Sequence, residues 1–308
     1  MPAGARAPGA AARRAGVVAL GAALVIGACA PALPEDVADG LTVELRQDRS
    51  QYADRTAALK VTNGSERTVT LLGASLAVQG FGASSPDGEP RARTLAPGAG
   101  RDVRLRLGDV DCAADAPAAL VGRAAQTTEV ATAAVLVASG ADASAPDGVE
   151  VEVGVTDPLG RLAAVHTEVC AERLIATGAA LRVAGVEPAR VTTPDGVEAG
   201  GRVTLAVDPV AGGPAVRLVR VAGTTLLSPA DGADWSGDDL AVQADGTVVL
   251  DVVPARCDPH VVAEDKRGTF LPVTAQVDGA EQPLVYVPMT DDQRAATYAV
   301  VHDACGWE

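Results

Sequence analysis

Cysteine and histidine side chains in the last fifth of the chain have the spacing of metal ligands. Cys257-Asp-Pro-His260 is a C-x-x-H unit, and His302 and Cys305 form a second pair close to the C-terminus. Two cysteines and two histidines are one of the sets that bind zinc tetrahedrally. The two cysteines could instead form a disulfide with each other, and one pair of sulfurs cannot do both. A metal site of Cys257, His260, His302 and Cys305 is therefore the alternative to a covalent cross-link, which we expect at these positions.

An acidic loop, PADGADWSGDD at residues 229–239, is a second place where side chains could do chemistry. Four carboxylates surround Trp235 there, namely Asp231, Asp234, Asp238 and Asp239. Carboxylates at this density could bind Ca²⁺, although their spacing is not that of an EF-hand. An acidic loop in solvent is the simpler interpretation. Trp235 is either an exposed anchor for a partner or a side chain packed over the end of a domain, and both readings stay open here.

The chain lacks the sequence signatures of the common enzyme classes. It has three histidines, and we find no G-x-S-x-G elbow, H-E-x-x-H motif, P-loop or dinucleotide fingerprint. His166 and His302, which occupy similar places in the two halves, are more typical of packed helix residues than of catalysts. We therefore expect no enzymatic activity, no catalytic residue and no cofactor. An envelope enzyme with an unrecognised site near residues 171–185 is the alternative.

The first 29 residues resemble the export signal of a bacterial lipoprotein. Arg6, Arg13 and Arg14 precede an apolar run at residues 15–26. That run has about 12 residues where a spanning helix needs about 20, so it fits the core of a signal peptide. It ends in Ile-Gly-Ala-Cys29, which resembles a lipobox. The resemblance implies cleavage before Cys29 and lipidation of Cys29 by diacylglyceryl and palmitate-type chains, with anchoring on the extracytoplasmic face of the cell membrane.

Lipidation of Cys29 would leave four cysteines in an oxidising compartment, where disulfides persist. Four cysteines allow three pairings. An internal repeat favours one of them, because an alternating strand leads into Cys112 and another into Cys257, while Cys170 and Cys305 each follow a Thr-Asp segment and a nearby histidine. The two halves are similar enough to be diverged tandem copies. We therefore predict the disulfides Cys112–Cys170 and Cys257–Cys305.

The Thr-Asp segments carry the chemistry of helix starts. Thr290 with Gln293 fits a capping box, and Asp157 with Pro158 fits an N-cap followed by proline at the first helical position. Downstream residues fall on one helical face in each half. In the first half they are Leu159, Leu162, His166, Val169 and Cys170, and in the second Tyr298, Val301, His302 and Cys305.

The rest of each half alternates in hydrophobicity as strands do. Asp-Gly and Asn-Gly pairs separate the alternating segments and favour tight turns. The predicted strands centre on residues 41–45, 59–61, 69–72, 76–78, 103–107, 135–137 and 149–153, then on 203–207, 216–221, 248–253, 273–277 and 284–287. This pattern predicts an all-β fold of two tandem immunoglobulin-like β-sandwich domains, each ending in a short disulfide-linked α-helix.

Composition restricts the partners of this protein. The net charge of −15 disfavours binding to nucleic acid. Aromatic residues are only 2% of the chain, so the cores must be packed with aliphatic side chains.

One segment of the second half is similar to a known motif. Residues 254–269, PARCDPHVVAEDKRGT, resemble a CDPHxVAEDKxGT motif of uncharacterised exported lipoproteins of actinobacteria. The resemblance implies membership of that family, and it does not point to any particular activity. Lys266, next to Glu264 and Asp265, could form a structural ion pair or an exposed contact, and the sequence leaves both open.

Together these patterns predict four segments. They are a signal peptide at 1–28, a tether at 29–40, a first sandwich at 41–174 and a second sandwich at 175–308. The expected protein is a lipid-anchored cell-envelope protein that acts as a binding or scaffolding module. Its partners would be the membrane, through Cys29, and an envelope protein.

Overall fold

The computed structural model describes residues 33–48, 51–52, 54–120, 122–139 and 148–307. Residues 1–28 and Cys29, with the predicted signal peptide and lipidation site, lie outside this set. The described part is mostly β, with about 45% strand and 20% helix. The all-β prediction is thus right about the dominant element and understates the helices.

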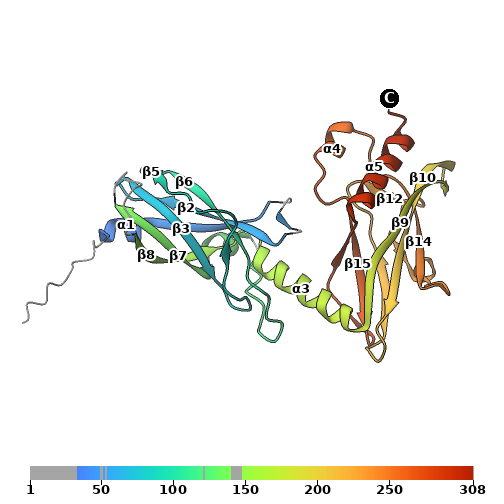
Figure 1. Cartoon of the computed structure of the whole chain (residues 1–308), viewed down its shortest axis with the longest axis horizontal. Helices are drawn as coiled ribbons and strands as arrows, with labels where there is room; N and C mark the ends of the chain where they lie inside the picture. Colours follow the sequence, from blue (N-terminus) through green and yellow to red (C-terminus); the bar gives the residue numbers. More distant parts are fainter. Residues whose placement is uncertain (1–32, 49–50, 53, 121, 140–147, 308) are drawn as a thin grey trace, which may run out of the picture. The chain divides into compact units, whose positions relative to one another are not determined.

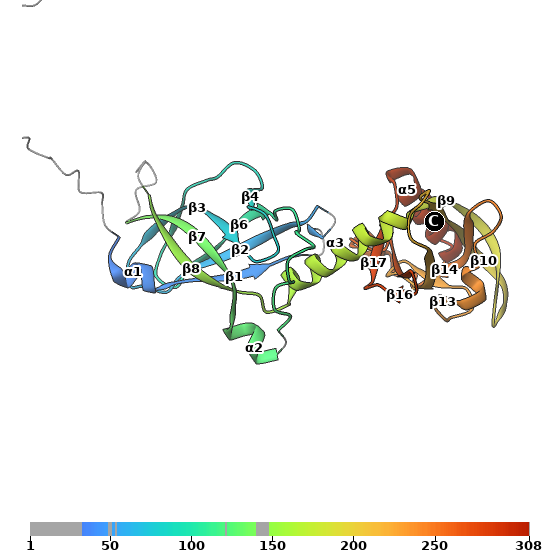
Figure 2. The same cartoon turned by 90° about the horizontal axis from the view of Figure 1, so that it is seen from below.

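The N-terminal half is built on one eight-stranded sheet (Figure 1). Its elements are α1 (Glu35–Asp39), β1 (Leu41–Arg46), β2 (Thr56–Asn63), β3 (Val69–Ala77), β4 (Ser85–Pro86), β5 (Arg93–Leu95), β6 (Gly100–Arg106), α2 (Gly122–Thr127), β7 (Glu129–Ser139), β8 (Val149–Thr156) and α3 (Arg161–Gly178). The strand order is β4-β6-β2-β1-β8-β7-β3-β5. Only β1 and β8 pair in parallel among the named strands of this sheet, and Figure 2 shows them side by side.

The C-terminal half has two antiparallel sheets, ordered β12-β14-β10-β9 and β13-β11-β15-β16, with β17 also paired to β15. Its elements are β9 (Ala179–Thr193), β10 (Gly196–Pro209), β11 (Val216–Val221), β12 (Leu227–Pro229), β13 (Trp235–Ser236), the 3-10 helix η2 (Gly237–Leu240), β14 (Thr247–Pro254), α4 (Pro259–Ala263), β15 (Phe270–Val277), β16 (Ala280–Glu281), β17 (Val285–Pro288) and α5 (Asp291–Cys305). The sequence patterns did not predict the long strand β9. Pro188 lies within it, which the fold tolerates because β9 is at the edge of its sheet.

The two halves pair their strands in a corresponding order. In the first, β1-β2-β6 and β3-β7-β8 are hydrogen-bonded runs, and in the second β9-β10-β14 and β11-β15-β17 are the equivalent runs. A helix follows the last strand of each half, α3 after β8 and α5 after β17. The correspondence places Cys112 and Cys257 at matching points, each after the third strand of the first run.

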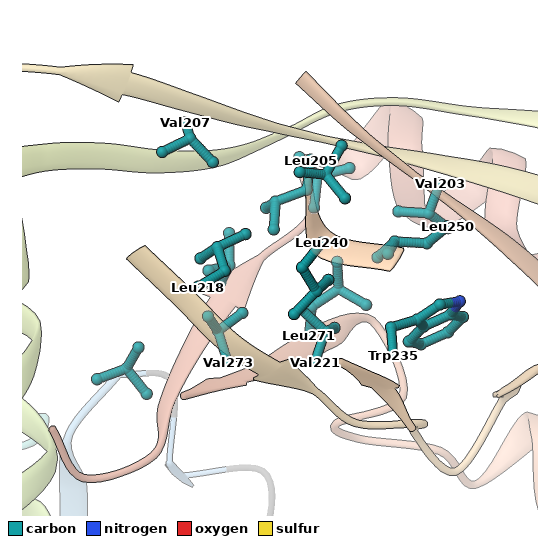
Figure 3. Close-up of a cluster of buried hydrophobic side chains, with 14 of the residues drawn as sticks. Val203, Leu205, Val207, Leu218, Val221, Trp235, Leu240, Leu250, Leu271 and Val273 are labelled. Atoms are coloured by element: carbon teal, nitrogen blue, oxygen red, sulfur yellow. The ribbon is translucent and has the colours of Figure 1, made fainter. Parts of the chain in front are cut away.

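Each half has its own hydrophobic core of buried aliphatic side chains. One cluster runs from Val37 to Val169 and the other from Ala171 to Val301, so the division falls inside α3. The predicted boundary at 174/175 also falls inside this helix. The second cluster includes Trp235 among residues of β10, β11, β14 and β15 (Figure 3). Two cores of this kind fit the low aromatic content, because most of their members are valine and leucine.

The segment predicted as a tether is partly structured. Residues 35–39 form α1, and Val37 is buried in the first core. Asp36 accepts a hydrogen bond from Arg67 Nε at 2.8 Å. The acidic residues Glu35 and Asp36 in the first turn favour a helix start electrostatically.

Helix α5 begins as predicted, with a capping box between Thr290 and Gln293. The predicted start of α3 is wrong. Asp157 and Pro158 lie in a turn before the helix, which begins at Arg161 after Gly160 adopts a left-handed conformation. Leu159, expected on the buried helical face, is consequently outside the helix and 71% exposed.

Asp157 nevertheless stabilises the first turn of α3. Its buried carboxylate accepts a hydrogen bond from the Leu162 backbone N–H at 2.8 Å. We expect Asp157→Ala to lower the free energy of unfolding by about 1–2 kcal/mol, since it removes a helix cap. Urea unfolding followed by circular dichroism measures this. Asp157→Asn, whose amide oxygen can still accept the bond, is the matched control and should lose less. Equal losses in the two variants would contradict the capping role.

Candidate functional site

The four cysteines other than Cys29 form two disulfides. Cys112 pairs with Cys170 and Cys257 pairs with Cys305, the pairing expected from the repeat. The first disulfide joins the loop after β6 to α3, and the second joins the loop after β14 to α5. Arg173 Nη1 donates to the Val110 carbonyl beside the first disulfide. Each disulfide therefore ties a loop to the helix that ends its half.

The four residues of the alternative metal site do not converge. Both sulfurs are used in the Cys257–Cys305 disulfide. The exposed His302 has Nδ1 3.1 Å from Asp303 Oδ1 and its ring edge against Trp307, while His260 is exposed on α4. Over the residues whose placement is described, no group of three or more His, Cys, Asp or Glu side chains is arranged to hold a metal ion.

Two carboxylates of the acidic loop form local contacts within the protein. Asp234 Oδ2 lies 2.8 Å from Arg220 Nε, and its other oxygen accepts from the Gly223 backbone N–H. Asp231 accepts from the Ala233 N–H. Trp235 is buried, at 7% exposure, so it packs in the core and is not an exposed anchor. The sequence alone could not distinguish these two positions for Trp235.

His166 is a packed core residue. It is 5% exposed, its Nε2 lies 3.1 Å from the Asp111 carbonyl oxygen, and its ring contacts the Phe81 edge. Gly80 has φ +78°, and a Cβ there would lie 2.8 Å from the His166 ring. Both the left-handed conformation and the close approach therefore require glycine at position 80.

A cavity of about 510 Å³ lies next to the AEDKRGT part of the segment at 254–269. We call it the Tyr286 pocket. Its lining residues come from several elements and include the C-terminal part of that segment, namely Tyr52, Gly223, Thr224, Thr225, Arg256, Glu264, Asp265, Lys266, Arg267, Phe270, Pro272 and Tyr286. Its volume is within the range of ordinary small-ligand sites, about 300–1,000 Å³.

The apolar floor of the pocket follows from strand alternation in β15 and β17. In β15 the odd-numbered residues are buried in the core, which leaves Phe270 and Pro272 on the outer face. Tyr286 of β17 pairs with Pro272 across the sheet and faces the same way. The pocket therefore has aromatic rings and a proline on the outer surface of a sheet whose other surface is core.

Arg267 covers one side of this floor. Its guanidinium carbon lies 3.7 Å from the Tyr286 ring centroid and 4.6 Å from the Tyr52 ring centroid, within the range of cation–π contacts. Arg161 of α3 approaches Tyr52 at 4.0 Å. Arg267 is thus held between two aromatic rings.

Glu168 of α3 lies at the edge of this cluster, with Oε1 3.9 Å from Arg267 Nη2. Burial raises the pKa of Glu168 above its ordinary value, and the neighbouring Arg267 offsets part of this effect. Leu33–Glu308 form one compact unit, and the contacts of Arg267 with Tyr52 and Glu168 lie within it.

A polar turn shapes the opposite wall. Asp265 accepts hydrogen bonds from the Thr225 hydroxyl and from the Gly268 backbone N–H. The Thr224 hydroxyl donates to the Gly268 carbonyl at 2.8 Å. A Cβ on Gly268 would lie 2.4 Å from the Leu226 side chain, so the turn requires glycine. Asp265 therefore has a structural role in this wall.

Lys266 and Arg256 are the cations of the pocket that have no carboxylate partner in the described part of the chain. Neither forms an ion pair there, and both are exposed. Of the two alternatives for Lys266, an ion pair with Glu264 or Asp265 is thus not formed, and an exposed position is what the structure has. The sequence drew attention to Lys266 but gave no sign that Tyr52 or Tyr286 would lie near it.

The described helices include none that is both long enough and apolar enough to cross a membrane. Comparison with protein-family models gives no match to this chain, and comparison with curated proteins gives none either.

Proposed function

We propose that this chain is a lipid-anchored cell-envelope protein that acts as a binding or scaffolding module, with the Tyr286 pocket as its contact site. In this proposal residues 1–28 are a signal peptide, and Cys29 carries the lipid on the extracytoplasmic face of the membrane. The resemblance of the segment at 254–269 to a motif of exported actinobacterial lipoproteins supports this proposal, and Glu264 to Arg267 of that segment line the pocket.

The proposed modules are two immunoglobulin-like domains. The antiparallel runs β1-β2-β6 and β3-β7-β8, matched by β9-β10-β14 and β11-β15-β17, support this assignment, because such sandwiches are built from antiparallel runs. In the first half, the parallel pair β1 and β8 joins the two runs into one sheet. The separate cores of the two halves support it as well. Immunoglobulin-like architecture alone implies no particular function, so the function must be argued from the site.

In this proposal the protein binds a partner and does not act as an enzyme. Within the part of the chain that is described, none of His166, His260 and His302 is hydrogen-bonded to a serine, a threonine or a free thiol. A nucleophile with an adjacent base is the usual arrangement for covalent catalysis. The net charge of −15 argues against nucleic acid as the ligand.

The observation that carries the proposal is the concentration of aromatic side chains. The chain has seven phenylalanine, tyrosine and tryptophan residues, and three of them, Tyr52, Phe270 and Tyr286, line one pocket. Aromatic side chains and arginine are enriched where proteins bind partners. In a chain so poor in aromatics, this grouping favours a contact site over random surface composition.

Site-specific photo-cross-linking tests the proposal in cells. A photoreactive residue at position 266 is expected to form a discrete adduct with an envelope component, and Tyr286→Ala should reduce its yield at least about tenfold because it removes an anchor worth about 2 kcal/mol. Tyr298→Ala, which removes a partly buried tyrosine outside the pocket, is the matched control. A photoreactive residue at the exposed Val242 should give no such adduct. An adduct that is equally strong at 242, or insensitive to Tyr286→Ala, would contradict the proposal.

A further inference from the structure

We propose that a second cavity, in the N-terminal half, binds a small oligophosphate, a ligand with several linked phosphate groups. The cavity has a volume of about 520 Å³ and is lined by residues of β3, β5 and β6 and of the loop from Asp87 to Arg91. We call it the arginine cleft, after Arg91, Arg93, Arg101 and Arg104 in its lining. It is independent of the Tyr286 pocket.

Strand register places arginines on two walls of the cleft. In β6, the exposed Arg101 lies on the same face of the strand as Val103 and the fully buried Leu105. In β5, the exposed Arg93 likewise lies on the same face as the fully buried Leu95. β5 and β6 stand near opposite ends of the strand order, with β5 hydrogen-bonded to β3 and β6 to β2. Arg93 and Arg101 are therefore exposed residues at the outer ends of core-facing rows, on two different strands that both line the cleft.

The four arginines have no carboxylate partner within the described residues. Arg93 and Arg101 each donate to the carbonyl of the preceding residue, and Arg91 and Arg104 have no side-chain hydrogen bond there. Nine other basic side chains of this part of the chain, all arginines, are paired with Asp or Glu within 4.0 Å. Eight further basic side chains of the described residues also lack a carboxylate partner, so what distinguishes these four arginines is that they line one cavity.

The cleft lining has three acidic residues against its four arginines. Asp87 lies 3.5 Å from Arg106, and Asp102 is directly opposite Lys60 in the register of β2 and β6. Glu89 is the third carboxylate of the lining, and neither Glu89 nor Asp102 forms an ion pair in the described part of the chain. The guanidinium groups therefore outweigh the acids inside the cleft, even though the whole chain is negative. Charges more than about 8–10 Å away are largely screened at physiological salt, so the nearby arginines dominate the potential at the cleft.

The arrangement of the donors indicates the class of ligand. A guanidinium group binds phosphate through two parallel hydrogen bonds, and each phosphate oxygen can accept from more than one donor. A single phosphate, such as that of a lipid headgroup, could engage one wall of the cleft. Linked phosphates could contact Arg93 and Arg101 at the same time. We infer that this double contact is the reason why the cleft prefers an oligophosphate to a single phosphate.

Isothermal titration of the purified full chain in detergent tests this inference, with sodium tripolyphosphate as the probe at about 50 mM salt, where screening is weak. One tripolyphosphate is expected to bind per chain. The double variant Arg93→Gln/Arg101→Gln should weaken binding at least about tenfold, because two charge-assisted contacts are lost. The matched control is Arg190→Gln/Arg217→Gln, which removes two exposed arginines of the second half that also lack carboxylate partners. It should leave the affinity within about twofold of the original chain, since charges beyond the screening length contribute little.

Two further probes decide the chemistry. Citrate carries several carboxylates and no phosphate, and sn-glycerol 3-phosphate carries the single phosphate of a lipid headgroup. Both should bind at least about tenfold more weakly than tripolyphosphate, because neither offers linked phosphates to both walls. Absence of tripolyphosphate binding, equal loss in the control variant, or equal affinity for either of these probes would overturn the inference. In that case Arg93 and Arg101 would be charges that protect sheet edges from aggregation.

Discussion

The Cys29→Ala chain is expected to lose all incorporation of radiolabelled palmitate and to leave the carbonate-washed membrane fraction. Two acyl chains give stable anchoring, whereas the apolar run at residues 15–26 is too short to span a bilayer by itself. Metabolic labelling and fractionation of cells that express the full chain measure both effects. Because lipidation is the proposed source of all membrane attachment, this is the largest change in behaviour that we expect from a single substitution.

The control for Cys29→Ala is the double variant Cys112→Ala/Cys170→Ala, which also removes cysteine sulfurs but leaves position 29 intact. It should keep the palmitate label and the membrane association. A Cys29→Ala chain that still carried the label, or that stayed in the washed membranes, would contradict lipid anchoring at this residue. It would also remove the support for an extracytoplasmic location, on which the proposed binding role depends.

Removal of either disulfide is expected to lower the free energy of unfolding by about 4 kcal/mol. The paired cysteines are 58 residues apart in the first disulfide and 48 in the second. In the chain-entropy account, loops of this length restrict the unfolded chain by about 4 kcal/mol, and the length difference between the two is nearly without effect. This is a large fraction of the stability of a typical domain, about 5–15 kcal/mol.

Urea unfolding of Cys112→Ala/Cys170→Ala and Cys257→Ala/Cys305→Ala, compared with the original chain, measures the two contributions. Since each half has its own core, we expect each double variant to shift the unfolding of its own half more strongly, as followed by hydrogen exchange in β2 and in β10. The original chain with its disulfides reduced should behave like the two variants combined. Losses below about 1 kcal/mol in both variants would indicate that the disulfides form without restricting the unfolded chain appreciably.

The two proposed sites also differ in how they depend on the rest of the fold. The arginine cleft is formed within the N-terminal half, by strands of one sheet and a connecting loop. The Tyr286 pocket needs Tyr52 from the N-terminal half together with β15, β17 and the segment before them. A variant that destabilises the second half should therefore impair the Tyr286 pocket and leave tripolyphosphate binding intact, which separates failure of one proposal from failure of the other.

Much of the fold was determined by sequence patterns that act locally. Alternation of valine and leucine with polar residues correctly predicted β1, β2, β6, β8, β10, β11, β14 and β15. Such alternation puts all apolar side chains on one face when the segment is a strand, so that face can be buried. The capping box at Thr290 located the start of α5 for a similarly local reason. The repeat in the surroundings of the cysteines was enough to select one of three pairings.

Other features depended on contacts that the sequence does not contain. Strand β9 carries charged residues and Pro188, and it is a strand because β10 pairs with it along its length. Asp157 looked like an N-cap, yet the left-handed Gly160 moved the start of α3 to Arg161. Trp235 was equally compatible with a surface anchor and a core residue until the sheets of the second half closed over it.

The candidate sites belong to the second group. The motif at 254–269 indicated that Glu264, Asp265 and Lys266 could form an ion pair or an exposed contact. Only the tertiary structure brings Tyr52 and Tyr286 into contact with Arg267. In the sequence, nothing distinguishes Arg93 and Arg101 from other strand residues. In the structure, the two strands that contain them line the same cavity. The sequence by itself determined where most strands and both disulfides lie, because propensity and spacing act over a few residues. Which side chains share a cavity was decided by packing between segments far apart in the chain, which no local pattern encodes.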